Sequence, residues 1–170
     1  GITPRLQHVL DALDVSPAIV RTAAWDVIAW NRAAALVLTD YAALPPGERN
    51  VLRMMFGNPR VREAQQDWQS VARHLVAAFR ADAARAGAVS HVADLVEELC
   101  RLSPEFASLW RENDVQYSGE GLKQLKHPVL GLVAFEYSSF VIDGRPDLTM
   151  VIYNPATSED AQRIRALVSR

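Results

Sequence analysis

Cysteine is almost absent from this sequence of 170 residues, and long apolar runs are absent altogether. The sole cysteine, Cys100, excludes an internal disulfide framework and a cysteine-rich zinc site, and it fits a reducing cytoplasm. No stretch of about 18 uncharged apolar residues occurs, so we expect no transmembrane helix and no membrane partner. The N-terminus also lacks the charged and then apolar pattern of a secretory signal. The sequence therefore predicts a cytoplasmic protein.

An excess of basic charge is also missing. The 18 lysine and arginine residues are balanced by 20 aspartate and glutamate residues, which gives a net charge of -2 and a pI of about 6.1. A domain that neutralises phosphates normally carries a clear basic excess on one face. We therefore do not expect these residues to bind nucleic acid by themselves.

The patterns of catalytic and metal-binding residues are missing as well. An enzyme needs convergent groups, such as a nucleophile with its base or a set of metal ligands. The histidines form neither HxxxH nor HxH, no cysteine lies at metal-ligand spacing from them, and neither GxGxxG nor GxxxxGK[ST] occurs. We expect no catalysis, no metal and no cofactor. The histidines are His8, His74, His91 and His127.

Strand patterns occur near both ends of the chain. The segment Ala18–Trp30 is rich in β-branched and aromatic residues and predicts two short strands, after which Asn31 suits the N-cap of a helix. In the last third, three segments alternate in the manner of strands: 122–126, 132–142 and 148–153.

Helix patterns fill the middle and the two ends of the chain. One continuous apolar stripe predicts a long helix from Arg60 to Arg85, and Ser158 is expected to cap a final helix. Thr3 and Pro4 suit the start of a short first helix, and the chain begins with Gly1 and not Met. The order of elements predicts an α+β fold, an antiparallel sheet of about five strands with several helices packed on one face.

Five segments, taken in order, resemble a known family. The strand that leads into an asparagine-capped helix resembles the PAS fold, and the whole set is similar to the ligand-binding domain of MmyB-like transcription regulators. The resemblance covers essentially the whole chain. The segments are Trp25–Ala35, Leu44–Phe56 (LPPGERNVLRMMF), Ser103–Trp110 (SPEFASLW), Lys126–Gly131 (KHPVLG) and Val151–Ala156 (VIYNPA).

The resemblance implies a sensory role without catalysis. It implies a helix-turn-helix DNA-binding domain of the XRE type upstream, and a pocket for a small apolar or fatty-acid-like effector. On this basis we expect residues 1–16 to be a linker helix from a missing DNA-binding domain, and residues 17–170 to form a PAS-like ligand-binding domain. DNA would then be bound only through the missing domain, and a homodimer is compatible with this arrangement.

A ligand of this kind needs apolar walls and one polar anchor. The run Met54–Phe56 suits such walls because methionine adapts its shape, although an ordinary packed helix would have the same sequence. The anchor candidates are Arg53, His127 and Tyr153. The predicted ligand-binding residues are Trp30, Arg53, Met54, Phe56, Trp68, Phe79, His127 and Tyr153.

Each of these residues also has a structural interpretation. The aromatic side chains suit a packed core. An unpaired guanidinium within an apolar helix is costly, so Arg53 needs a partner, either a ligand carboxylate or the side chain of Glu48 or Asp67. His127 could serve the turn at Pro128, and Tyr153 could pack across strands.

Three other functions compete with the ligand-binding interpretation. A dimerisation module with a filled core would use the long helix and the strand edges. A small α+β enzyme would need the convergent groups that are missing. A haem- or flavin-binding sensor would need an axial ligand from His74 or His91.

Overall fold

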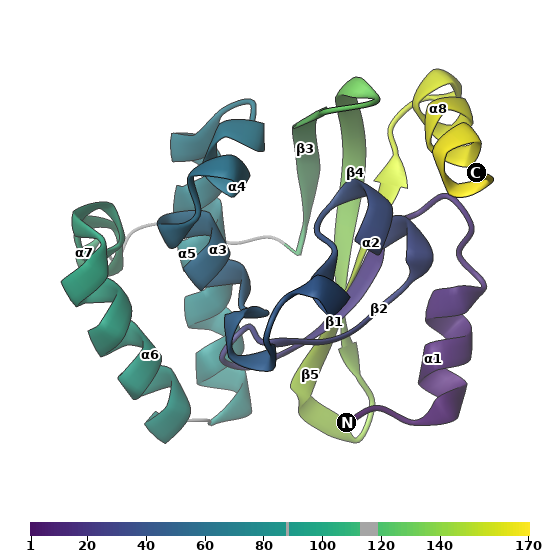
Figure 1. The fold of residues 1–170 in the computed structure, drawn as a ribbon. Coiled ribbons are helices and arrows are strands. Elements are labelled where there is room, and N and C mark those ends of the chain that lie inside the picture. The colour runs from purple at the N-terminus through teal and green to yellow at the C-terminus, as the bar shows by residue number, and fades with distance from the viewer. Residues whose placement is uncertain (88, 113–118) are drawn as a thin grey trace.

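The computed structural model describes residues 1–87, 89–112 and 119–170. Within this part of the chain, five strands form one open antiparallel sheet in the order β2-β1-β5-β4-β3 (Figure 1). The first strand therefore pairs with the last, which closes the fold around the segment between them. The strands are β1 (Ala18–Thr22), β2 (Val27–Trp30), β3 (Glu120–His127), β4 (Gly131–Ile142) and β5 (Arg145–Pro155).

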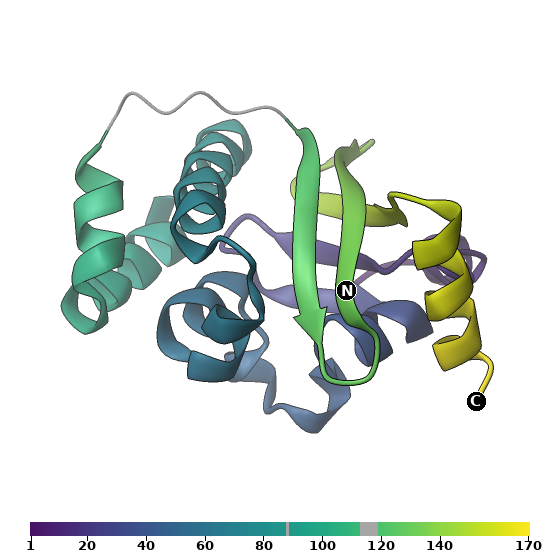
Figure 2. The same cartoon turned by 90° about the horizontal axis from the view of Figure 1, so that it is seen from above.

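Most helices between β2 and β3 gather beside the sheet, whereas the first of them (Arg32–Val37) lies over the strands and packs against the last helix at the opposite end (Figure 1 and Figure 2). This arrangement confirms the predicted α+β fold with an antiparallel sheet. The α-helices of the described residues are α1 (Pro4–Asp11), α2 (Arg32–Val37), α3 (Val51–Gly57), α4 (Pro59–Ala64), α5 (Trp68–Ala86), α6 (Val89–Leu102), α7 (Pro104–Arg111) and α8 (Ser158–Val168).

Asn31 connects the N-terminal helix, the sheet and α2. Its side-chain oxygen accepts hydrogen bonds from the amides of Ala34 and Ala18, at 2.9 and 3.1 Å. Its side-chain nitrogen donates to the carbonyls of Leu10, Leu13 and Ser16. The predicted N-cap is confirmed, and the same buried amide also fixes the loop between α1 and β1.

The two faces of β1 pack against different parts of the molecule. Because side chains alternate along a strand, Ala18 and Val20 point to one face and contact the cluster that includes Leu10 of α1. Ile19 points to the other face, where it packs with Tyr41 and Met54. A small displacement of β1 therefore changes side-chain packing on both faces of the sheet.

A second core lies among α3, α5, α6 and α7, and Trp25 joins it to the sheet. Trp25 follows β1 with a φ of 66°, a strained conformation for a bulky residue. Its ring packs against Phe79 at 6.0 Å, and its Nε1 donates to Asp82 at 2.8 Å. Asp82 also pairs with Arg21 of β1, which points to the same face of the sheet as Ile19. This buried cluster therefore holds α5 on that face, which we call the inner face.

The predicted single helix from Arg60 to Arg85 is wrong. The helix stops at Ala64, and Gln65 forms an isolated antiparallel bridge with Leu125 of β3. Asp67 then caps α5, accepting from the amide of Ser70. An apolar stripe does not reveal this break, because the residues on both sides of it are helical.

The expected N-cap of the last helix is also wrong, by one residue. The hydroxyl of Thr157 accepts from the amide of Asp160 at 3.1 Å, whereas Ser158 is the first residue within α8. Both residue types suit this position, so the sequence alone does not choose between neighbours.

Candidate ligand-binding site

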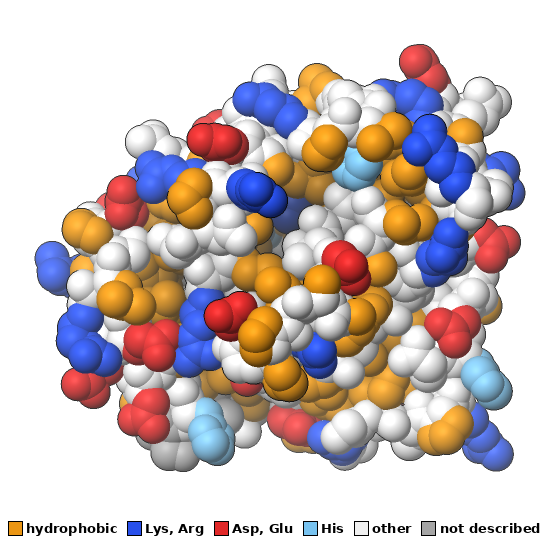
Figure 3. Space-filling view, in the orientation of Figure 1, with side chains coloured by type: hydrophobic (Ala, Val, Ile, Leu, Met, Phe, Trp, Pro, Cys, Tyr) orange, Lys and Arg blue, Asp and Glu red, His pale blue; other side chains and the backbone are white. Residues whose placement is uncertain are grey.

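A cavity of about 640 Å³ lies between the inner face of the sheet and helices α2, α3 and α4. Its volume is within the range of about 300–1,000 Å³ that is typical of small-molecule sites. Figure 3 shows that this face of the molecule is hollowed between the helices and the strands, with basic side chains at the hollow. Most of the lining is apolar, and it includes Ile19, Leu38, Met54, Met55, Val61, Leu75 and Leu125.

Two tyrosines place hydroxyl groups within these apolar walls. Tyr41 is only 3% exposed, and burial together with the nearby Tyr153 raises the pKa of its phenol, while a hydrogen bond with Thr39 opposes the shift. The Tyr41 phenol therefore keeps its proton at neutral pH and is available as a neutral donor. The ring of Tyr153 is held by Phe135 at 6.3 Å and by Tyr137 at 6.1 Å.

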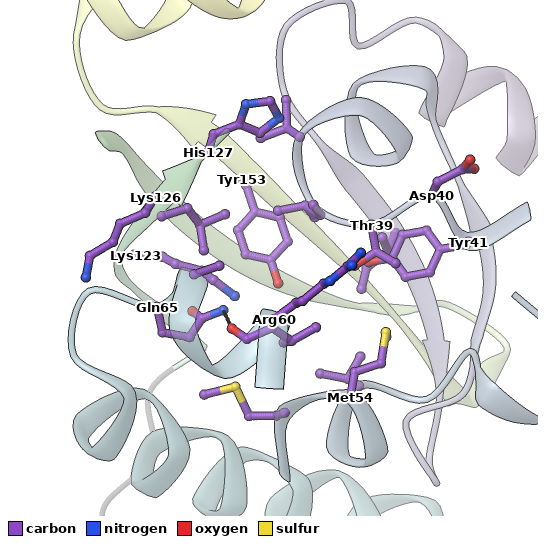
Figure 4. Close-up of a pocket in the computed structure, with 18 of the residues that line it drawn as sticks. Thr39, Asp40, Tyr41, Met54, Arg60, Gln65, Lys123, Lys126, His127 and Tyr153 are labelled. Atoms are coloured by element: carbon purple, nitrogen blue, oxygen red, sulfur yellow. Dashed lines mark hydrogen bonds between the residues drawn. The ribbon is translucent and has the colours of Figure 1, made fainter. Parts of the chain in front are cut away.

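Lys123 of β3 is a basic group that lines the site. In Figure 4 its ammonium and the hydroxyl of Tyr153 point toward the same space, and Nζ lies 5.4 Å from the centre of the Tyr153 ring. Burial, and then the charge of Arg21, lower the pKa of Lys123 to about 8. Among the residues that the structure describes, no carboxylate forms an ion pair with this lysine.

A smaller cavity of about 290 Å³ adjoins the first, and Leu75, Lys123 and Tyr153 line both. In the smaller cavity the hydroxyl of Tyr137 is hydrogen-bonded to Nε2 of His74, and burial lowers the pKa of that histidine. The two cavities therefore meet at a lysine and a tyrosine.

Three of the eight residues predicted to bind ligand line the larger cavity: Met54, His127 and Tyr153. Both ring nitrogens of His127 are engaged with the backbone. Nδ1 accepts from the amides of Val129 and Leu130, so Nε2 carries the proton and donates to the carbonyl of Leu36 at 2.9 Å. In this geometry His127 has no ring nitrogen left for a ligand.

The other five predicted residues line neither of the two cavities. Trp30 packs against Tyr41 from outside the larger cavity, with ring centres 5.4 Å apart. The remaining aromatic residues, Phe56, Trp68 and Phe79, pack within the helical core.

Arg53 is paired with Glu98 of α6, and the expected partners Glu48 and Asp67 are wrong. Its Nε lies 2.7 Å from a Glu98 oxygen and its Nη1 donates to the carbonyl of Gly47. The hydrogen bond from Arg53 is the main cause that lowers the pKa of Glu98. The guanidinium is therefore occupied by the protein itself.

Sequence reasoning did not single out Lys123, Tyr41 or Arg60, all of which line the larger cavity. Lys123 alternates with the exposed Leu122, so the strand pattern did not show which of the two faces inward. Arg60 is exposed on α4, and in Figure 4 it extends across the cavity toward Tyr41 and Thr39.

Other kinds of site find no support in the described ranges. No three histidine, cysteine, aspartate or glutamate side chains there come together as metal ligands. None of the helices seen in these ranges combines the length and the apolar character needed to cross a membrane. Cys100 is half-buried against the helical core.

Comparison with known proteins gives one finding that covers nearly the whole chain. A family model described as "MmyB-like transcription regulator ligand binding domain" matches residues 2–167. No curated protein matches the sequence.

Proposed function

The chain belongs to the family of MmyB-like transcription regulator ligand binding domains, and from this premise we propose that it senses a small amphipathic, fatty-acid-like effector. The observation that carries the proposal is the cavity of about 640 Å³ with apolar walls and inward hydroxyls. Met54 and Met55, on α3, suit a flexible chain because methionine side chains adapt their shape. Tyr41, Tyr153 and Lys123 supply the few polar groups that orient a ligand.

The proposed output is a change in DNA binding by an XRE-type helix-turn-helix domain upstream of residues 1–16. Ile19 lines the cavity, and its neighbours Ala18 and Val20 pack against the residues around α1. A ligand that displaced β1 would therefore act on α1 through rigid packing. In this role the chain is a cytoplasmic sensor and not a catalyst.

Thermal unfolding in the presence of ligand tests this function. Dodecanoate and other amphipaths should stabilise the folded state by linkage, by about 2.7 kcal/mol at a hundredfold excess over the dissociation constant. Ala64 lines the cavity, so Ala64→Phe should fill part of it and abolish the shift in melting temperature. Ala84→Phe, at an exposed position of α5, is the matched control and should keep the shift.

A filled core would contradict the proposal. If no member of a fatty-acid and terpenoid panel shifts the melting temperature of the wild-type chain, the cavity is not a ligand site. If the ligand raises the melting temperature of Ala64→Phe as much as that of Ala84→Phe, the ligand binds elsewhere.

Homodimerisation is the second candidate, and exposed apolar side chains on the strands favour it. Leu122 and Phe140 are 75% and 51% exposed, and β3 is an edge strand of the sheet. Edge strands and apolar patches often mark protein contacts. Light scattering coupled to size-exclusion chromatography should give twice the chain mass if this surface is an interface, and a single chain mass would contradict it.

A further inference from the structure

Basic side chains outnumber acidic ones in the lining of the smaller cavity, which includes Arg21, Lys123 and one carboxylate, that of Glu120. The carboxylate of Asp82, only 3% exposed, lies outside this lining and is shared by Arg21 at 3.1 Å and Arg85 at 2.7 Å. Asp82 also accepts from Trp25, so its two oxygens accept three hydrogen bonds. Lys123 is close enough to Arg21 to feel its charge and has no described carboxylate partner.

Arg21 itself has an unused donor. Its side chain is 5% exposed, lines the smaller cavity, and pairs with Asp82 through Nη2. Its Nε is buried and has no hydrogen-bond partner among the described residues. Leaving a buried donor unpaired is costly, so an acceptor in the smaller cavity would be favoured once a small shift of the Arg21 side chain brings Nε to the cavity surface.

We propose that the junction of the two cavities is an anion subsite, at which Lys123 and Nε of Arg21 bind the carboxylate of the effector. The inference rests on the proposed function and adds the residues that hold the head group of a fatty-acid-like ligand. The apolar chain of that ligand fills the larger cavity. The head group supplies the acceptor that Arg21 lacks and the counter-charge that Lys123 lacks.

The other cations near the cavity are less suited to this role. Arg53 is paired with Glu98, and both ring nitrogens of His127 bind the backbone. Lys126 also lines the larger cavity, but its side chain is exposed, and in Figure 4 its ammonium is turned away from Lys123 and Tyr153. Arg60 remains as a rival because it crosses the mouth of the cavity, but its exposed side chain is already solvated and gains less from a ligand carboxylate.

Calorimetric titration with dodecanoate and dodecanol at pH 7 separates the head group from the chain. Most Lys123 is protonated at that pH, because its pKa in the empty site is about 8. The wild-type chain should prefer dodecanoate over dodecanol by roughly ten- to hundredfold, the range expected for a charge-assisted hydrogen bond. Lys123→Met should bring this ratio close to one while it leaves dodecanol binding intact. Lys126→Met is the matched control on the same strand and should keep the preference.

The melting temperature of the ligand-free chain distinguishes a ligand-binding role of Lys123 from a structural one. Lys123→Met should raise the melting temperature of the ligand-free chain, since it removes a half-buried charge that forms no ion pair with a described carboxylate. A lysine with a structural role would lower it instead.

The outcomes distinguish the inference from the function on which it rests. If the wild-type chain binds both probes equally, or if Lys123→Met keeps the preference for dodecanoate, the anion subsite is wrong and the ligand cavity stands. If Arg60→Met loses the preference for dodecanoate but Lys123→Met keeps it, the carboxylate binds Arg60 at the mouth of the larger cavity. If neither probe binds the wild-type chain, the proposed function fails and the subsite fails with it.

Discussion

Replacing Gly121 by alanine tests the packing between β3 and β4 at the smaller cavity. Gly121 lies opposite Tyr137 in the sheet, and a Cβ atom at this position would lie 2.6 Å from the Tyr137 hydroxyl oxygen and 2.8 Å from Cζ. The ring must therefore move, although it is held by its hydrogen bond to His74. We expect overpacking and the strained hydrogen bond to lower the free energy of unfolding by about 1–3 kcal/mol.

Urea denaturation gives the magnitude, and a double-mutant cycle isolates its cause. Alanine is favoured over glycine in a strand by about 0.5–1 kcal/mol when nothing obstructs it. In a Tyr137→Leu background, Gly121→Ala should therefore be neutral or slightly stabilising. Equal destabilisation by Gly121→Ala in both backgrounds would refute the proposed clash with the ring.

Three further substitutions are to be measured by denaturant unfolding. Lys123→Met should raise the free energy of unfolding by about 1–2 kcal/mol at pH 7, less than its full pKa shift implies because the side chain is only half-buried. The folded-state pKa is about 8 against 10.5, so wild-type stability should rise between these pH values, and a flat profile would contradict the assignment. Asn31→Ala should cost about 3 kcal/mol, since buried hydrogen bonds on three segments are lost, and a cost below about 1 kcal/mol would count against this role. Arg53→Met should cost at most about 1 kcal/mol and leave dodecanoate affinity unchanged, because its pair with Glu98 is partly exposed; weaker binding would restore Arg53 as an anchor.

Much of the fold follows from local signals in the sequence. Asn31 caps α2, as its side chain and position predict, and Ser103 caps α7 in the same way. The strand pattern of 132–142 also agrees with β4, since Phe135 and Tyr137 both pack on Tyr153. These features depend on residues close in the chain, where hydrogen-bonding type and periodicity decide the outcome.

The candidate site was less predictable because it depends on contacts between distant segments. The partner of Arg53 is 45 residues away on α6, so its neighbours in sequence could not identify it. Phe56 and Trp68 are aromatic and lie near the methionines in sequence, yet they pack on each other with ring centres 5.5 Å apart. Composition indicated a pocket with apolar walls, but the packing of α4 against β3, and of Met54 on α3 against Ile19 of β1, decides which side chains line it.

The methionines offer the most direct test of the ligand cavity, because the chain has three of them on two different faces of the sheet. Met54 and Met55 line the larger cavity, whereas Met150 belongs to the cluster beneath α1. In a chain labelled with ¹³C at the methionine methyl groups, saturation with dodecanoate should move the NMR signals of Met54 and Met55 far more than that of Met150. Signals that all stay in place, or a Met150 signal that moves as much as that of Met54, would contradict binding in this cavity.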